Sequence, residues 1–169
     1  MRGSVALLLT LYFLRAAVAE VNSALSGMHV WLFVGGLFVT YSALAMPFRG
    51  GFFASLLAGL LCDAVTPVRF GTHAALFAIA HVIVFNLRER VQRDETSVRV
   101  AVALLANVGL YLALSFTRIR LGHGGAGMWP RMLSDLAWSE VVVALIAPWF
   151  FALQLRSLEL ARANTSRSA

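Results

Sequence analysis

Asp63 is the residue whose position most needs a chemical explanation. Its carboxylate ends an apolar run, and a charge at the centre of a spanning helix costs about 2.5 to 3.5 kcal/mol. Such a group needs a partner, and Arg69 is the nearest candidate along the chain. We predict a polar network of Asp63, Arg69 and His73. This network would either bind or couple to a ligand, or fix the turn between two helices.

The other reactive side chains indicate little chemistry. His73 and His81 lie eight residues apart, which differs from the i, i+4 pair of a helical zinc site, so we expect no metal. Ser55 lacks the G-x-S-x-G elbow of a hydrolase, and no serine, histidine and acid stand at a suggestive spacing. Glycines at 122, 124 and 127 match a dinucleotide-binding pattern, but no strand precedes them. We therefore expect neither an enzyme nor a cofactor.

Small residues recur at every fourth position before Asp63, namely Gly51, Ser55 and Gly59. This spacing places them with Asp63 along one face of a helix. Small side chains on such a face let a second helix approach closely. We predict that this face, together with Gly71, is a helix-packing surface, either within the chain or toward a partner protein.

Thr66 and Pro67 connect this face to the next apolar run. A threonine followed by a proline is typical of the N-cap and first turn of a helix. The sequence therefore predicts a helical hairpin, made of a small-residue helix, an acidic end, a Thr-Pro turn and a second helix.

The composition is that of a membrane protein. Of the 169 residues, 60% are hydrophobic and 13% are charged, which is too apolar for a soluble domain of this size. Apolar runs occupy residues 5–19, 30–46, 52–65, 70–87, 100–116 and 138–155. We predict an all-α fold with one transmembrane domain over residues 1–169, six spanning helices and a polar cytoplasmic tail over 156–169. The first and third runs are short, so a short or re-entrant third helix is an alternative.

The distribution of arginine predicts the orientation, since arginine is retained on the cytoplasmic side. With the N-terminus inside, nine arginines lie in cytoplasmic segments: Arg2, Arg49, Arg88, Arg90, Arg93, Arg99, Arg156, Arg162 and Arg167. Four lie in external segments: Arg69, Arg118, Arg120 and Arg131. This asymmetry favours both termini in the cytoplasm. It also explains the net charge of +6 without a nucleic-acid partner, and we expect none.

The N-terminus also resembles a secretory signal, because an apolar stretch and small residues at 17–19 precede Glu20. Arg15, between the stretch and the small residues, is unusual for such a signal. An uncleaved first helix also leaves an even number of spans, so we expect it to remain. Mass spectrometry of the mature N-terminus would test this expectation.

The predicted hairpin resembles a known pattern. Residues 59–73 read GLLCDAVTPVRFGTH, which is similar to the central signature of MreD, the rod-shape-determining membrane protein of bacteria. In that family a glycine, two apolar residues and an aspartate end one helix, and a turn leads to a glycine that opens the next. The aligned positions are Gly59, Asp63, Pro67, Gly71 and His73. The external loop and the last two spans match nothing specific to the family.

This resemblance implies a non-enzymatic scaffold of the cell-elongation complex in the bacterial inner membrane. Besides membrane lipid, the implied partners are an MreC-like protein, an MreB-like filament, a RodA-like glycosyltransferase and a class B penicillin-binding transpeptidase. The family is also similar in fold to the S-component of energy-coupling-factor (ECF) vitamin transporters. The alternative function is such a substrate-binding subunit, in which Asp63, Arg69, His73 and the 122–127 loop would line an outward-facing pocket.

Overall fold

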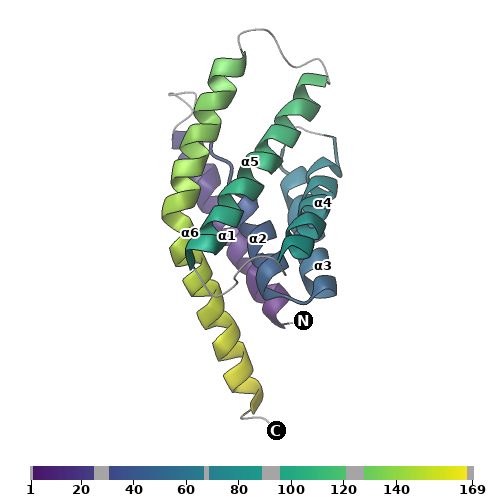
Figure 1. Cartoon of the computed structure of the whole chain (residues 1–169), viewed down its shortest axis with the longest axis vertical. Helices are drawn as coiled ribbons and strands as arrows, with labels where there is room; N and C mark the ends of the chain where they lie inside the picture. Colours follow the sequence, from purple (N-terminus) through teal and green to yellow (C-terminus); the bar gives the residue numbers. More distant parts are fainter. Residues whose placement is uncertain (1, 25–30, 67–68, 89–95, 121–127, 167–169) are drawn as a thin grey trace.

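The computed structural model describes residues 2–24, 31–66, 69–88, 96–120 and 128–166. Within these ranges the chain forms six helices and no strand: α1 (Arg2–Ala24), α2 (Gly35–Ala45), α3 (Phe48–Asp63), α4 (Thr72–Leu87), α5 (Thr96–Arg120) and α6 (Met128–Ser166). The predicted all-α fold with six helices is confirmed for this part of the chain. Successive helices alternate in direction, so the first and last described residues lie toward the same end of the bundle (Figure 1).

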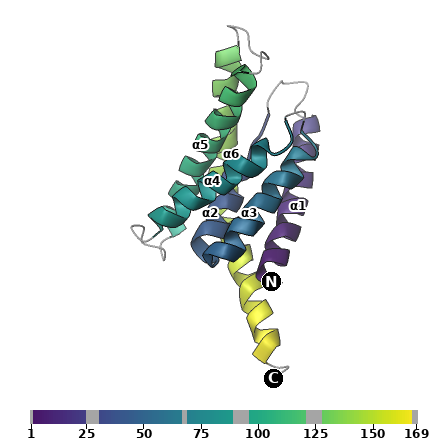
Figure 2. The ribbon, with the colours of Figure 1, turned by 90° about the vertical axis from the view of Figure 1, so that its right-hand side faces the viewer.

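The last two helices are the longest apolar ones. Thr96–Ile119 in α5 and Trp129–Gln154 in α6 are each long and apolar enough to cross a membrane. Both helices extend beyond the apolar runs predicted at 100–116 and 138–155, because α5 ends at Arg120 and α6 begins at Met128. At its other end α6 continues past the apolar run into the tail, and its last turns project beyond the other helices in both views (Figures 1 and 2).

The second apolar run departs from the prediction. A helix was expected throughout residues 30–46, but residues 31–34 lie outside any helix, Val34 has a φ of −127° and a ψ of 18°, and α2 begins only at Gly35. We call these four non-helical residues, 31–34, the extended segment. The α2 helix is therefore 11 residues long, whereas α3 and α4 have 16 residues each. Helices of 16 residues extend about 24 Å, which is shorter than the usual spanning length.

The core of the bundle is built around α2. Every residue from Gly35 to Ala43 is buried, because α2 contacts α3, α4, α5 and α6. Phe38 packs edge-on against Phe150 of α6 with ring centroids 5.2 Å apart. A helix that is covered on all sides has no solvated polar face, which is why this run contains no charged residue and its apolar residues are not confined to one side.

The outward faces of the other helices expose large apolar side chains. They include Phe53, Leu57 and Leu61 on α3, Ile79 and Ile83 on α4, Leu105, Leu112 and Phe116 on α5, and Leu145, Trp149 and Leu153 on α6. Soluble monomers rarely expose contiguous apolar surface on this scale. The bundle is therefore apolar on the side where a water-soluble protein would be polar.

Candidate functional site

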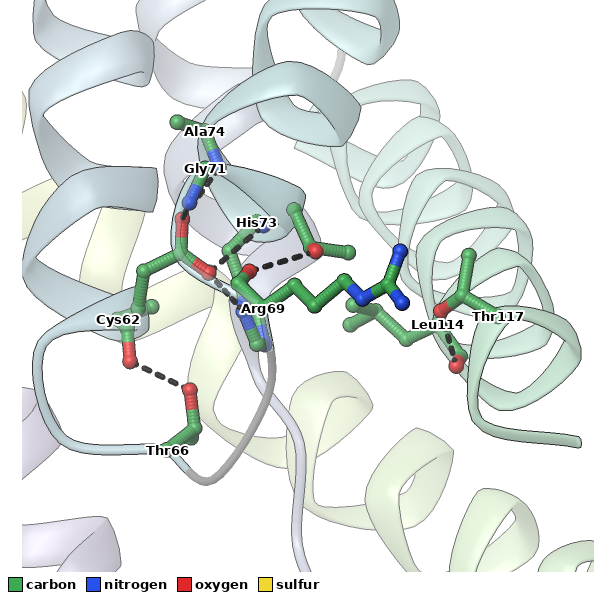
Figure 3. Close-up of polar contacts among 10 residues, drawn as sticks. Cys62, Thr66, Arg69, Gly71, His73, Ala74, Leu114 and Thr117 are labelled. Carbon is green, nitrogen blue, oxygen red and sulfur yellow. Dashed lines mark hydrogen bonds and ion pairs between the residues drawn. The ribbon is translucent and has the colours of Figure 1, made fainter. Parts of the chain in front are cut away.

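The carboxylate of Asp63 accepts four hydrogen bonds from the start of α4 (Figure 3). Its Oδ1 accepts from the backbone N–H of His73 at 2.9 Å and from ring Nδ1 of His73 at 2.8 Å. Its Oδ2 accepts from the backbone N–H groups of Gly71 at 2.9 Å and Ala74 at 3.2 Å. A carboxylate offers about four acceptor positions, so these contacts use its whole capacity. Asp63, at the end of α3, thus caps the N-terminus of the following helix.

Gly71 has a different role from the one predicted. It was expected on the packing face, but a Cβ on Gly71 would meet nothing within 4 Å. Its backbone instead has a φ of 95°, a left-handed conformation that glycine adopts without steric cost. This turn directs the first N–H groups of α4 toward Asp63.

The structure changes two predictions about the hairpin, the helix that Thr66 caps and the partner of Asp63. The hydroxyl of Thr66 donates to the carbonyl of Cys62 at 2.7 Å, so Thr66 ends α3 instead of capping α4, and Pro67 lies outside the described residues. Arg69 was expected to pair with Asp63. Its side chain is exposed and extends away from the carboxylate toward Leu114 and Thr117 of α5 (Figure 3). The predicted network therefore contains Asp63 and His73 without Arg69.

The small-residue face of α3 packs inside the chain. Gly51, Ser55, Gly59 and Asp63 are all buried. A Cβ on Gly59 would lie 2.4 Å from Cα of Ala74 in α4, and a Cβ on Gly51 would lie 2.4 Å from the carbonyl oxygen of Ser42 in α2. The close approach of backbones requires glycine at both positions. Of the two predicted uses of this face, packing within the chain is the one found, and the face leaves no room for a partner protein.

A cluster of Ser42, Ser55 and His81 links α2, α3 and α4. The Ser42 Oγ lies 2.6 Å from Ser55 Oγ and 3.1 Å from Nδ1 of His81, and Ser55 Oγ lies 3.2 Å from the same nitrogen. Sequence reasoning missed this serine–histidine cluster because each residue comes from a different helix. The one sequence signal was that Ser55 belongs to the row of small residues at every fourth position, which indicated that it is buried.

A hydroxyl beside an imidazole is also the arrangement used in nucleophilic catalysis. Here the side chain of Ser55 is 1% exposed and that of His81 is 0% exposed. The imidazole is surrounded by the rings of Phe48, Phe52 and Phe85, with centroids 5.8, 6.1 and 6.0 Å from it. A substrate has no access to this position, so the cluster serves to hold three helices together.

This arrangement predicts non-additive mutations. Ser42→Ala and Ser55→Ala should each lower the free energy of unfolding by about 1 kcal/mol, because the other hydroxyl still contacts Nδ1 of His81. The double variant should lose at least about 1 kcal/mol more than the sum, since it leaves a buried nitrogen without a partner. Unfolding in detergent measures all three variants. Strictly additive losses would contradict the shared contact.

The extended segment is held by side chains from α1 and α5. Asn22 of α1 pairs with both backbone groups of Leu32: its Oδ1 accepts from the N–H at 2.8 Å, and its Nδ2 donates to the carbonyl at 3.1 Å. Asn107 of α5 accepts from the N–H of Gly36 at 3.1 Å and donates to the carbonyl of Phe33 at 3.0 Å. The two asparagines thus replace hydrogen bonds that a helix would make for itself.

Helix α6 completes this arrangement. Oδ1 of Asp135 accepts from the N–H of Trp31 at 3.1 Å, and Oγ of Ser139 accepts from the N–H of Phe33 at 3.0 Å. We call Asn22, Asn107, Asp135 and Ser139 the clasp. Nδ2 of Asn107 also donates to Oε1 of Glu140 at 2.9 Å. In the sequence, Asn107 and Glu140 stand out only as polar residues within or bordering the predicted spans. The pair of glycines that opens α2 is the one signal that a helix boundary lies there.

Comparison of the chain with family models, with curated proteins and with solved structures finds no match. Its function is therefore inferred from its own residues and their arrangement.

Proposed function

We propose that this chain is a multi-pass protein of the bacterial inner membrane and a non-enzymatic scaffold of the cell-elongation complex, as its resemblance to MreD implies. The observation that carries the proposal is how the hairpin uses its signature residues. Gly59 admits the backbone of α4, Asp63 caps that helix, and Gly71 and His73 supply donors to the cap. A scaffold needs a fixed shape and no reactive group, and these residues all serve shape.

The spacing of aromatic and basic residues supports the membrane location. Trp129 and Trp149 are both exposed on α6, and at about 1.5 Å per residue they lie about 30 Å apart, the thickness of a hydrocarbon core. Tryptophan prefers the two membrane interfaces. On α5, Arg99 and Arg118 lie about 28 Å apart by the same measure and flank an apolar stretch. This spacing fits helices that cross a bilayer.

The second run also fits a crossing, although α2 is short. Its 11 helical residues extend about 16 Å, and the extended segment adds at most about 13 Å at about 3.3 Å per residue. Together they extend up to about 30 Å, which is the thickness of a hydrocarbon core. Irregular backbone at that depth is tolerated only where protein or a cavity surrounds it, as the clasp does here.

The alternative function, a substrate-binding subunit of an ECF-type transporter, has no comparable support in the arrangement of these residues. Its expected pocket would use Asp63 and Arg69, but the acceptor positions of Asp63 are filled by α4 and the side chain of Arg69 is directed toward α5. On the same side of the bundle the ring of Phe33 contacts Phe77 and Tyr111, with centroids 6.5 and 6.2 Å away. These contacts favour a packed interior over a ligand pocket.

The scaffold proposal is tested by depleting the protein from the bacterium that encodes it. We expect rods to widen and become round, and wild-type protein to co-purify with an MreC-like protein from solubilised membranes. Cells that keep their width, together with no co-purification, would remove the proposal. Thermal stabilisation of the purified protein by one member of a vitamin panel would favour the transporter subunit instead.

A further inference from the structure

Two residues of the extended segment, Leu32 and Val34, lie in the interior, but the segment makes its hydrogen bonds to other helices. Leu32 and Val34 are 6% and 8% exposed, so water cannot satisfy their backbone groups. In such surroundings a helix is the default, because it satisfies every backbone group internally. The segment stays extended only because four clasp residues from α1, α5 and α6 supply donors and acceptors.

The same backbone groups have a second way to be satisfied. If α2 were wound back to Leu32, the N–H of Gly36 would donate to the carbonyl of Leu32 and the N–H of Leu37 to that of Phe33. In the structure, Asn22 and Asn107 occupy these carbonyls and the N–H of Gly36. No proline stands between residues 31 and 46, so nothing in the sequence prevents winding. Clasp and helix thus compete for the same groups.

We propose that the extended segment is a two-state element, which is extended while the clasp is closed and joins α2 as helix when the clasp opens. Four residues extend at most about 13 Å outside a helix and about 6 Å within one, so winding draws Trp31 toward the centre of the bundle by up to about 7 Å. Because the clasp residues come from three helices, a shift of α1, α5 or α6 changes the state of the central helix. Broken helices of this kind move in other membrane proteins. The inference does not depend on the scaffold function.

Winding of the extended segment would also move the ring of Phe33, which packs between α4 and α5. Its ring occupies the space beside Gly35, where a Cβ would lie 2.5 Å from Cζ of Phe33 and 2.7 Å from Cζ of Phe77. Residues two apart in a helix point about 200° away from each other. Winding therefore removes the ring from its position against Phe77 of α4 and Tyr111 of α5. The contact between α4 and α5 loosens on that side.

Spin labels report the transition directly. Labels are attached through Trp31→Cys and Leu153→Cys, both at exposed positions, in a Cys62→Ala background reconstituted in lipid nanodiscs. Asn107→Ala should add a population of distances shorter than that of the parent protein by up to about 7 Å. Leu105→Ala, an exposed change on the same helix, should leave the parent distances unchanged. A folded Asn107→Ala protein that keeps only the parent distances would overturn the proposal.

A second variant covers the case in which Asn107→Ala does not fold. Ser139→Ala removes the acceptor of the Phe33 N–H and the hydroxyl that donates to the carbonyls of Trp31 and Asp135, but it leaves both asparagines of the clasp in place. It should also raise the share of the shorter distance. Amide hydrogen exchange over residues 31–36 is the parallel measurement. Slower exchange at Gly36 in the fraction with shorter distances supports winding, whereas faster exchange throughout the segment without a shorter distance means that it merely frays and contradicts the proposal.

Discussion

Asp63→Leu is expected to lower the free energy of unfolding by about 3 to 5 kcal/mol, the cost of breaking a buried charged network. The substitution places an apolar side chain at the end of α3 and removes the carboxylate that accepts four hydrogen bonds. The N–H groups of Gly71, His73 and Ala74 then lose the acceptor that Asp63 provides at the start of α4. The hairpin should open at this end first.

Cys62, the single cysteine of the chain, makes this loss measurable. It precedes Asp63 and is partly buried, so a thiol-reactive fluorophore in detergent reports the opening of α3 during heating. Asp63→Asn should fall between the wild type and Asp63→Leu, because its amide keeps one oxygen. Arg69→Ala is the control and should change stability by no more than about 0.5 kcal/mol. A loss in Arg69→Ala as large as in Asp63→Leu would mean that the partner of Asp63 is misassigned.

Gly59→Ala is expected to destabilise the protein by about 2 to 3 kcal/mol through overpacking. The added Cβ would lie 2.4 Å from Cα and 2.6 Å from the backbone nitrogen of Ala74. Backbone atoms cannot rotate away as the end of a side chain can, so α3 and α4 must separate. That separation also lengthens the hydrogen bonds that Asp63 makes to the same turn of α4.

Gly109→Ala is the matched control, since it makes the same chemical change in a helix. A Cβ on Gly109 would meet nothing within 4 Å, so the variant should be neutral or more stable by up to about 1 kcal/mol through helix propensity. Thermal unfolding in one detergent compares the two. Equal effects of both substitutions would show that α3 and α4 do not depend on close contact at Gly59.

Features that rest on side-chain type and period were predictable from the sequence. The apolar runs predicted six helices in an all-α fold. The small residues at every fourth position, Gly51, Ser55 and Gly59, predicted a buried face on one helix. The sequence could not say which helix covers that face, because glycine permits any close neighbour. The structure shows that it is α4, with α2 at Gly51.

The two features that the sequence did not predict, the cap made by Asp63 and the extended segment, depend on hydrogen bonds of the backbone. Side-chain hydropathy carries no information about such bonds. Arg69 was the expected partner of Asp63 because it is the nearest cation, but the carboxylate binds backbone N–H groups that every sequence contains. The extended segment reads as helix because its side chains are apolar. Its conformation is set by Asn107 and Ser139, which lie 71 residues from Gly36 and 106 residues from Phe33. No local pattern carries that information.

The clasp closes only after the last helix has been made. Asp135 and Ser139 follow their partners in the extended segment by 104 and 106 residues, so the ribosome delivers them long after it has made the segment. Until then the segment has to satisfy its backbone as a helix or with water. The α3–α4 hairpin, in contrast, has its cap complete once Ala74 is in place. The two-state proposal therefore gives synthesis an order, in which the hairpin forms early and α2 reaches its final length only when α6 is in place.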